Sequence, residues 1–481
     1  MTGGAPLENA AANVAAPRQR RGDSALSAPA PARLGRAARR LSAALATGAA
    51  VIASAGMAGD GPDLPRPVSD ADFATHGAEE IALGQLLFYD PILSGNRNIS
   101  CATCHHPRFA TSDGLALGVG EGGVGLGPDR RIDPANPPED RIPRNAPALF
   151  NLGAHEFTVL FHDGRVETDA SRPSGLRTPM EDEMLLGFSG VLSAQTMFPV
   201  LSADEMAGHY SENDVSQAVR QGIVTGPGGA WDRLSRRVSA IPDYADRFAR
   251  AYPDIAEGRE IGFTDISNAI AAFVAHEWRS DDSPFDAHLR GEAMLAGPAS
   301  RGMELFYGPA RCASCHAGPF QTDHQFHPMG VPQIGPGKAL SFESHSRDEG
   351  RFRVTGDPRD LYAFRTPPLR NVTRTGPWGH DGAFADLSAF LRHHADPKAG
   401  DAEYAPDVTL PAGIPGDDFA PLADATARAA VLGAVRTPPV GLSDAEIADL
   451  VAFLAALEDP VALSGRLGIP DSVPSGLPVD R

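Results

Sequence analysis

The chain has 481 residues, which is enough for two or three domains that each bury a core of their own. Its formal net charge is −19, and the acidic residues are spread along the chain, which argues against a nucleic-acid partner. The 51 glycines and 43 prolines favour many short elements joined by long loops over a continuous sheet.

The first residues have the features of a secretory signal peptide. Four arginines between positions 33 and 40 precede an apolar run over residues 41–55, which ends in the small-residue pattern Ala53-Ser54-Ala55. The run is short for a bilayer span, and no later stretch is long and apolar enough. We therefore expect residues 1–55 to be a cleavable signal peptide that directs a protein without a membrane span to the periplasm. The segment before residue 33 is long for such a signal, so the start codon and the cleavage site stay open.

All four cysteines belong to two Cys-x-x-Cys-His units, at residues 101–105 and 312–316. In an exported protein four cysteines suggest two disulfides, and two such pairs can also build a zinc site. Neither alternative explains a histidine directly after each second cysteine. Covalent haem attachment does, because the thiols add to the haem vinyl groups and the adjacent histidine becomes an axial ligand of the iron. The sequence predicts two covalently bound haem c groups, held by Cys101, Cys104, His105, Cys312, Cys315 and His316.

Helical spacing of apolar residues dominates the rest of the chain. It covers residues 78–89 before the first haem motif and recurs, in chain order, at 214–221, 230–238, 244–251, 264–278, 300–306, 386–394 and 443–457. Residues 113–144 are rich in glycine and proline without such spacing and are expected to form a loop. Its run GVGEGGVGLG is unlike a nucleotide-binding loop, since no strand precedes it and no helix follows. The expected fold class is mainly α, with two cytochrome c-like domains at residues 60–240 and 241–470 joined by long loops.

Several segments together resemble the bacterial diheme cytochrome c peroxidase and MauG family. They are LGQLLFYDPILSGNRNISCATCH, IPRNAPALFNLG, FHDGR, AQTMFPVLSADEM, the second CASCH, FRTPPLRNVTRTGPWGHDG and the closing helix, and they extend from Ala78 to Leu457. The resemblance implies two cytochrome c domains with a calcium ion between them. It also implies a peroxidatic haem in the N-terminal half and an electron-transfer haem in the C-terminal half. The expected enzyme is a haem-dependent peroxidase that acts on hydrogen peroxide.

The loop after the first haem motif offers no strong ligand to the second axial position of the iron. Residues 107–144 contain no His, Met, Lys, Tyr or Cys, whereas the peroxidases that resemble this chain carry a loop histidine there. His106, next to the proximal ligand His105, is interpreted as a surface residue. We therefore expect an open first iron that reacts with peroxide without prior reduction, as in the MauG branch.

Peroxide cleavage requires a group that takes a proton from one oxygen and returns it to the other. Glu205 is the candidate, because the segment AQTMFPVLSADEM that contains it matches the distal-pocket segment of the family. Gln195 would line the same pocket. The spacing of Ser202 and Glu205 also fits a helix capping box, which is the alternative role for this glutamate.

The second haem needs a distal ligand from the residues that follow His316. The candidates are Met329, His380 and His394, and alignment on the family favours His394, at the position where the peroxidases carry Met and MauG carries Tyr. His393 points about 100° away from it on a helix, so both cannot face one iron. The alternative is that both are solvated histidines at a helix end. Ligation by two histidines favours oxidised iron more than methionine does, so this haem should be a better store of oxidising equivalents.

Five positions bear on the region between the haems. FHDGR has His162 where relatives have Trp, which puts the usual inter-haem relay in doubt, and Trp378 is interpreted as a core residue. By resemblance, calcium would be bound by the Asn145 side chain and the carbonyls of Thr375 and Pro377, since oxygen ligands suit this hard ion.

Three functions are compared. The first is a diheme oxidase that uses peroxide to modify a Trp or Tyr of a partner protein, as in the methanobactin-associated enzymes that this chain resembles. The second is a cytochrome c peroxidase that takes electrons from a small cytochrome or cupredoxin, and the third is a non-catalytic electron carrier. Glu205 and the open iron oppose the third, and His394 with the missing loop histidine favours the first over the second. Residues 165–195, longer than in short relatives, are interpreted as a surface loop or a rim for a protein partner.

Overall fold

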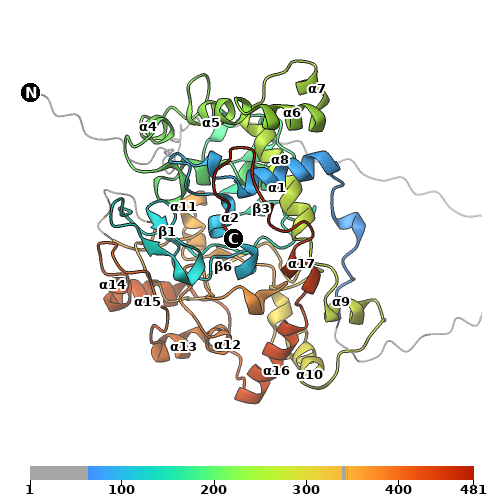
Figure 1. Ribbon diagram of the computed structural model, residues 1–481. Helices are drawn as coiled ribbons and strands as arrows, with labels where there is room; N and C mark the ends of the chain where they lie inside the picture. The colour runs from blue at the N-terminus through green and yellow to red at the C-terminus, as the bar shows by residue number, and fades with distance from the viewer. Residues whose placement is uncertain (1–62, 339–342, 344) are drawn as a thin grey trace, which may run out of the picture. The chain divides into compact units, whose positions relative to one another are not determined.

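The computed structural model describes residues 63–338, 343 and 345–481, so the expected signal peptide lies outside the described residues (Figure 1). In this part of the chain helices predominate, as predicted, and the strands are short. No helix in these ranges is long and apolar enough to cross a membrane.

The helices and strands are short and numerous. The α-helices are α1 Ala78–Tyr89, α2 Cys101–Cys104, α3 Val191–Gln195, α4 Asp214–Arg220, α5 Ala230–Ser239, α6 Pro242–Ala251, α7 Pro253–Ala256, α8 Phe263–Glu277, α9 Pro284–Leu289, α10 Gly297–Phe306, α11 Phe352–Thr355, α12 Leu387–Ala395, α13 Pro397–Glu403, α14 Ala420–Ala423, α15 Ala425–Ala434, α16 Asp444–Ala455 and α17 Pro460–Ser464. The strands form three antiparallel sheets: β1 Gly123–Val124 with β2 Arg131–Ile132; β3 Val159–Leu160, β4 Val166–Thr168 and β5 Leu176–Arg177; and β6 Phe326–His327 with β7 Phe364–Arg365.

Two helix crossings repeat the same construction before the two haem motifs. α1 packs against α8 and α10 packs against α16, and α1 and α10 each end shortly before a Cys-x-x-Cys-His unit. A Cβ on Gly84 would lie 1.8 Å from the Ala269 carbonyl oxygen, and one on Gly302 would lie 1.9 Å from the Asp449 carbonyl oxygen. Glycine is therefore required at both crossings for the helices to approach this closely. The sequence carries the repeat as GQLLFY and GMELFY, a signal that helical spacing alone does not reveal.

Each of the two large hydrophobic cores is built around one of these helix crossings. The first core contains side chains of α1, α3, α5, α6 and α8, with an aromatic group of Phe88, Phe273 and Trp278. The second contains side chains of α10 and α16, with Phe285 packed edge-on against Phe453. α6 and α8 therefore pack with the N-terminal half, although the expected boundary near residue 240 places them in the other domain. The assignment of the halves as two cytochrome c domains stays a prediction.

Residues 113–144 are folded against the rest of the protein instead of forming an open loop. β1 and β2 pair within this segment. Its buried apolar residues are Leu115, Ala116, Leu117 and Val119. The guanidinium of Arg130 donates hydrogen bonds to the carbonyls of Gly120 and Gly125, both at 2.6 Å. One buried arginine thus satisfies backbone oxygens that no helix or long strand would otherwise pair.

Candidate haem sites and the region between them

The first Cys-x-x-Cys-His motif begins on the short helix α2. His105 follows this helix, and its Nδ1 donates to the Thr111 carbonyl oxygen (2.9 Å), which leaves Nε2 as the nitrogen available to a metal. Burial raises the pKa of the Cys101 and Cys104 thiols to about 12, so both are neutral at pH 7.

The second motif repeats this arrangement after α10. Nδ1 of His316 donates to the Gln321 carbonyl oxygen (3.0 Å), so both proximal histidines use Nδ1 on a nearby backbone carbonyl. All four cysteines are free, which contradicts the disulfide alternative. Each motif therefore presents two thiols and one imidazole Nε2, the donor set that covalently bound haem c uses, and the residues fit two haems.

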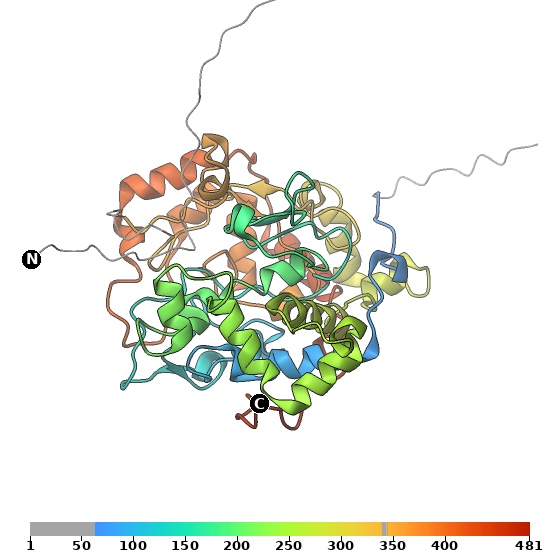
Figure 2. The same ribbon diagram turned by 90° about the horizontal axis from the view of Figure 1, so that it is seen from above.

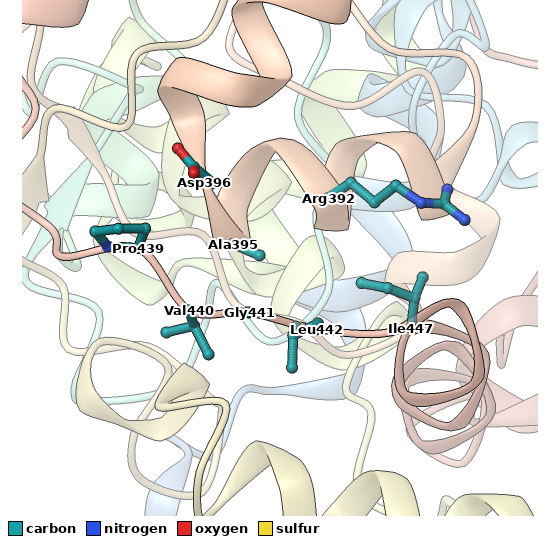
Figure 3. A pocket seen from close by; sticks show the side chains of 8 residues that line it. All are labelled: Arg392, Ala395, Asp396, Pro439, Val440, Gly441, Leu442 and Ile447. Carbon is teal, nitrogen blue, oxygen red and sulfur yellow. The ribbon is translucent and has the colours of Figure 1, made fainter.

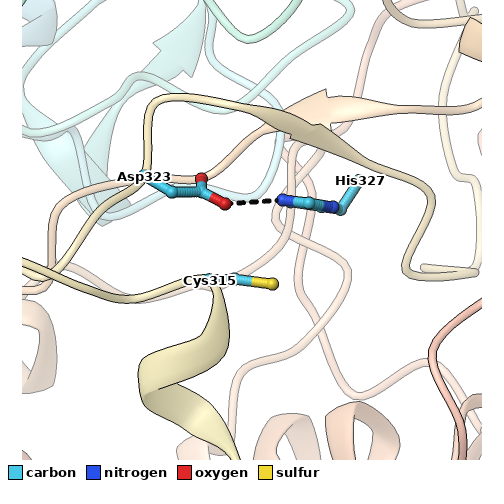
Figure 4. A group of neighbouring side chains, drawn as sticks. All are labelled: Cys315, Asp323 and His327. Atoms are coloured by element: carbon cyan, nitrogen blue, oxygen red, sulfur yellow. Dashed lines mark hydrogen bonds and ion pairs between the residues drawn. The ribbon is translucent and has the colours of Figure 1, made fainter. Parts of the chain in front are cut away.

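Cys315 has two further polar neighbours at the edge of the second motif (Figure 4). Nε2 of His327 lies 2.8 Å from a carboxylate oxygen of Asp323, and one ligand atom of each of the three residues lies within 4.8 Å of the others. The Cys315 thiol and then the Asp323 carboxylate raise the pKa of His327 to about 9. Within the described residues this group does not join the two cysteine pairs, so the zinc alternative built from both pairs is wrong. Because Cys315 belongs to the haem motif, Asp323 and His327 are neighbours of the second haem, not a separate metal centre.

Glu205 lies on a π-helical turn, Ala203–Ala207, after α3. The Ser202 hydroxyl accepts a hydrogen bond from the Glu205 amide (3.3 Å), which is one half of the alternative capping box. The other half is missing, because the Glu205 carboxylate makes no hydrogen bond to the Ser202 amide in the described structure. Burial raises the pKa of Glu205, and the nearby Arg165 and Lys338 oppose this shift. The carboxylate is therefore not used for capping and is available for proton transfer.

The glycine-rich segment packs against this turn. The Glu121 amide donates to the Asp204 carbonyl oxygen (2.9 Å), and a Cβ on Gly120 would lie 2.4 Å from the same oxygen. A side chain at residue 120 would therefore prevent the contact. Glu205 also lies near enough to Cys104 to contribute, after burial, to the raised pKa of that thiol. The structure thus brings Glu205 and the first haem motif into one region.

Two further residues near the first motif have defined positions. Gln195 is the last residue of α3 and is half-buried, and its place beside Glu205 stays a prediction. His106 is only 1% exposed, and its Nδ1 accepts a hydrogen bond from the Arg108 amide (3.2 Å). The interpretation of His106 as a surface residue is wrong, because its side chain is buried next to Asp480 near the end of the chain.

α12 carries both histidines considered for the second iron, and they point in different directions. Nε2 of His393, a fully buried residue, donates to the Met329 carbonyl oxygen (3.1 Å). Nδ1 of His394 donates to the Phe390 carbonyl oxygen (3.2 Å), which leaves Nε2 as its free nitrogen. Burial, with smaller contributions from His393 and His316, lowers the pKa of His394 to about 3. His394 is therefore a neutral imidazole near His316, the form that binds a metal.

The competing ligands of the second haem have other partners. Met329 engages His393 through its carbonyl, and its sulfur lies 3.6 Å from the Thr437 hydroxyl. His380 is buried and stacks on Phe364, with ring centroids 3.8 Å apart and planes inclined by 19°. These placements favour His394, whose ligation stays a prediction.

His162 follows β3 in a strongly basic environment. Its carbonyl accepts a hydrogen bond from the Arg365 amide (2.8 Å). Burial, together with the charges of Arg144, His380 and Arg365, lowers its pKa to about 3, so the imidazole is neutral. His162 is thus an uncharged imidazole at neutral pH. Trp378 is half-buried and donates from its indole N–H to the Val372 carbonyl oxygen (2.9 Å), and its interpretation as a core residue stays a prediction.

A buried ion cluster beside His162 joins segments that are far apart in the sequence. Arg144 lies 2.7 Å from Asp163 and 2.7 Å from Asp348, and the three side chains are 7%, 4% and 3% exposed. Burial alone would raise the pKa values of these carboxyls, but the Arg144 charge holds both well below their usual range. The cluster is therefore ionised at all pH values near neutrality.

Asn145 is positioned by contacts with two distant segments. Its backbone N–H donates to the His380 carbonyl oxygen (2.9 Å), and its Nδ2 donates to the Leu115 carbonyl oxygen (2.7 Å). Oδ1 is therefore the side-chain atom that a calcium ion would contact. Thr375 and Pro377 are half-buried and lie shortly before His380 in the chain, and their role as calcium ligands stays a prediction.

A surface pocket of 220 Å³ lies between the end of α12 and the segment that leads into α16 (Figure 3). It is lined by Arg392, Ala395, Asp396, Pro439, Val440, Gly441, Leu442 and Ile447. None of the predicted site residues is among them.

Comparison with known proteins agrees with this geometry. The family model described as di-haem cytochrome c peroxidase matches residues 78–294. The methylamine utilization protein MauG of Methylorubrum extorquens is 29% identical over 388 residues, which is 80% of each chain. The cytochrome c551 peroxidase of Pseudomonas aeruginosa is 27% identical over 325 residues, or 67% of this chain and 74% of the relative.

Solved structures that are similar to this chain are also MauG-like proteins and diheme peroxidases. A MauG-like protein associated with microbial copper homeostasis is 28% identical, with a TM-score of 0.54, and the match covers 84% of this chain and 96% of that one. The diheme peroxidase BthA from Burkholderia thailandensis has the same fold, at 22% identity and a TM-score of 0.53, with 88% and 95% of the two chains covered.

Two Cys-x-x-Cys-His motifs on a mainly helical fold define a haem-dependent oxidoreductase of the peroxidase type. Residues 78–294 match the di-haem cytochrome c peroxidase family, and over most of its length the chain is similar to MauG and to the cytochrome c peroxidases, which agrees with two haem cofactors.

Proposed function

We propose that this protein reacts with hydrogen peroxide at its N-terminal haem and uses the oxidising equivalents to modify a Trp or Tyr of a partner protein in the periplasm. The observation that carries this proposal is the position of Glu205, a half-buried carboxylate that does not cap its helix and lies near a haem motif whose loop offers no second ligand. The alternative is a cytochrome c peroxidase that reduces hydrogen peroxide to water with electrons from a small cytochrome c or cupredoxin.

The proton chemistry of peroxide cleavage is assigned to Glu205. A haem bound at residues 101–105 would supply an iron that binds peroxide and accepts its oxidising equivalents. Glu205 would take the proton from the peroxide oxygen nearer the iron and return it to the other oxygen, which leaves as water. Burial supports both steps, because a carboxyl with a raised pKa gains and loses a proton closer to neutral pH.

The second haem is assigned the storage of oxidising equivalents. His394 is neutral, has a free Nε2 and lies near His316, so these two imidazoles would hold the iron of a haem bound at residues 312–316. Ligation by two imidazoles favours oxidised iron. Such a haem accepts electrons from a donor cytochrome less readily than a Met-ligated one, which favours oxidation of a partner residue over steady reduction of peroxide.

Overall similarity to relatives does not separate the two functions. MauG and the cytochrome c551 peroxidase match at 29% and 27% identity. The choice depends on particular positions, namely a loop over residues 107–144 without a ligand residue and His394 in place of Met. The likeness to the MauG-like protein associated with microbial copper homeostasis supports a place beside the MauG branch.

Replacement of Glu205 by Gln tests the proposal directly. With both haems retained, the second-order rate constant for reaction with hydrogen peroxide should fall by about 10²- to 10⁴-fold, the usual contribution of general acid–base catalysis. Ser202→Ala is the matched control, because it removes the cap of the same turn and keeps the carboxylate. It should cost about 0.5–2 kcal/mol of stability and leave the rate constant nearly unchanged. Equal rates for Glu205→Gln and wild type would reduce Glu205 to a structural residue.

Turnover with an electron donor separates the two functions. Reduced small cytochrome c or cupredoxin is mixed with the diheme protein and hydrogen peroxide, and oxidation of the donor is followed by absorbance. Slow turnover, together with a mass increase in a co-expressed partner protein, supports modification of the partner. Rapid turnover of the donor would favour the cytochrome c peroxidase instead.

A further inference from the structure

The last part of the chain reaches the first haem motif. Residues 465–481, here called the C-terminal strap, follow α17 and lie beyond Leu457, where the resemblance to the family ends. Figures 1 and 2 show this segment in dark red beside α1, with the end of the chain near α2 in Figure 1. The peroxide chemistry described above does not involve these residues.

The C-terminal strap is held on helices of the first core. The Glu277 carboxylate at the end of α8 accepts hydrogen bonds from two consecutive strap amides, at 2.7 and 2.8 Å. Gln85 of α1 donates to the Gly468 carbonyl oxygen (2.8 Å), and Asp90 accepts a hydrogen bond from the Ser475 hydroxyl (2.6 Å). Its apolar residues that pack into or against the first core are Ile469, Val473, Leu477 and Val479. These contacts fix the path of the strap before it reaches α2.

Asp480 contacts the haem motif itself. Thr103, the residue before Cys104, donates from its hydroxyl to the Asp480 carboxylate (2.6 Å). The same hydroxyl oxygen accepts a hydrogen bond from the Ser100 amide (3.0 Å), so its proton is directed at Asp480. Thr103 is 2% exposed, and a charged acceptor makes a hydrogen bond in such a buried place strong. The Asp480 carboxylate is also one of the negative charges near Arg130, and it partly offsets the lowering of the Arg130 pKa by burial.

We propose that Asp480 is a positioning residue for the first haem, because it holds the haem-binding turn through Thr103 and keeps a negative charge beside the attachment point at Cys104. The inference rests on the proposed function in taking the first haem as the one that meets peroxide. A negative charge near an iron favours its oxidised, more positive form. The C-terminal strap therefore lowers the reduction potential of the first haem and leaves that of the second unchanged.

The test is a spectroelectrochemical titration of the full protein with both haems bound, which gives the midpoint potential of each iron. In Asp480→Asn the potential of the first haem should rise by about 59 mV, equivalent to a tenfold lower ratio of oxidised to reduced iron at a fixed potential. Asp471→Asn is the matched control, because Asp471 lies on the same strap and is fully exposed. It should leave both potentials at their wild-type values.

Substitutions of Thr103 keep the inference testable if Asp480→Asn does not retain its haems. Thr103→Val removes the hydrogen bond that holds the Asp480 carboxylate beside Cys104, so the charge moves away and the first-haem potential should also rise. Thr103→Ser keeps the hydroxyl and should preserve the wild-type value. The proposal is overturned if Thr103→Val and Asp480→Asn both keep the wild-type potential. Equal shifts of both haems, or the same shift in Asp471→Asn, would overturn it as well.

The outcome is separable from that of the proposed function. A Glu205→Gln variant that reacts with peroxide at the wild-type rate would contradict the role of Glu205, while the first-haem potential would still report on Asp480. Conversely, unchanged potentials in the strap variants would leave the Glu205 result valid.

Discussion

The buried Arg144 cluster predicts a large, pH-dependent loss of stability when its arginine is removed. In Arg144→Leu the carboxylates of Asp163 and Asp348 would stay buried but lose the cation that lies 2.7 Å from each. Asp163 would keep Arg165 at 3.2 Å, whereas Asp348 would keep a hydrogen bond from the Gly350 amide at 3.0 Å. The two carboxylates are therefore not equally affected, and Asp348 loses its nearest cation.

The expected loss is about 3–5 kcal/mol of unfolding free energy at pH 7, the cost of leaving a buried charge without its partner. In the wild type both carboxyl pKa values are lowered, so the stabilisation is complete above the unfolded-state pKa of about 4 and is lost as the pH falls through the folded-state values. In the variant the sign reverses, because burial without Arg144 raises these pKa values. The penalty is then complete at high pH and shrinks as acid protonates the carboxyls.

Urea unfolding of the diheme protein, followed by circular dichroism at pH 7.5 and pH 5, measures both effects. The difference between Arg144→Leu and wild type should be about 3–5 kcal/mol at the higher pH and clearly smaller at pH 5. The double variant Arg144→Leu/Asp348→Leu should recover much of the loss. Arg359→Leu is the control, since Arg359 is 82% exposed and pairs with Asp357 on the surface. A loss below about 1 kcal/mol at pH 7.5, or an equal loss at both pH values, would refute the reasoning.

Three further predictions concern the haem sites and calcium. His394→Gly should convert the second haem from a low-spin to a high-spin electron paramagnetic resonance signal, with imidazole restoring the former; an unchanged signal would exclude His394 as a ligand. Asn145→Ala should weaken calcium binding at least about tenfold, the effect of even indirect metal contacts, and an unchanged affinity in calorimetry would exclude its side chain. Because burial raises the pKa of Glu205, the rate with peroxide should fall as the pH drops through that value. This pH dependence should be absent in Glu205→Gln. If the variant and the wild type have the same pH–rate profile, another group is responsible for the pH dependence.

Local sequence patterns predicted the helices well because their determinants lie within the helices themselves. α1 has the predicted bounds, and α16 has the expected capping box, in which Glu446 accepts a hydrogen bond from the Ser443 amide (2.8 Å). Patterns within one segment could not assign α6 and α8 to the N-terminal half. That packing depends on contact between α1 and α8 at Gly84, across almost 200 residues of chain.

Site residues within a local motif could likewise be predicted from the sequence, whereas those that depend on a distant segment could not. The thiol and imidazole donors of the two haem motifs could be predicted, since five consecutive residues carry them. The burial of His106, the approach of Gly120 to the Glu205 turn and the contact of Asp480 with Thr103 could not, because each depends on a distant segment. Glycine and polar residues in such contacts carry no apolar periodicity that a sequence pattern would show.

The two haem motifs begin from one scaffold and differ in what distant segments bring to them. Both follow a helix with the GxxLFY pattern, and both direct the proximal Nδ1 to a backbone carbonyl. Around the first motif, the turn Ala203–Ala207 and the C-terminal strap bring two carboxylates, Glu205 and Asp480. Near the second motif, α12 brings His394. The proposed division, with peroxide cleavage at the first haem and storage of oxidising equivalents at the second, therefore depends on these distant segments and not on the shared helices.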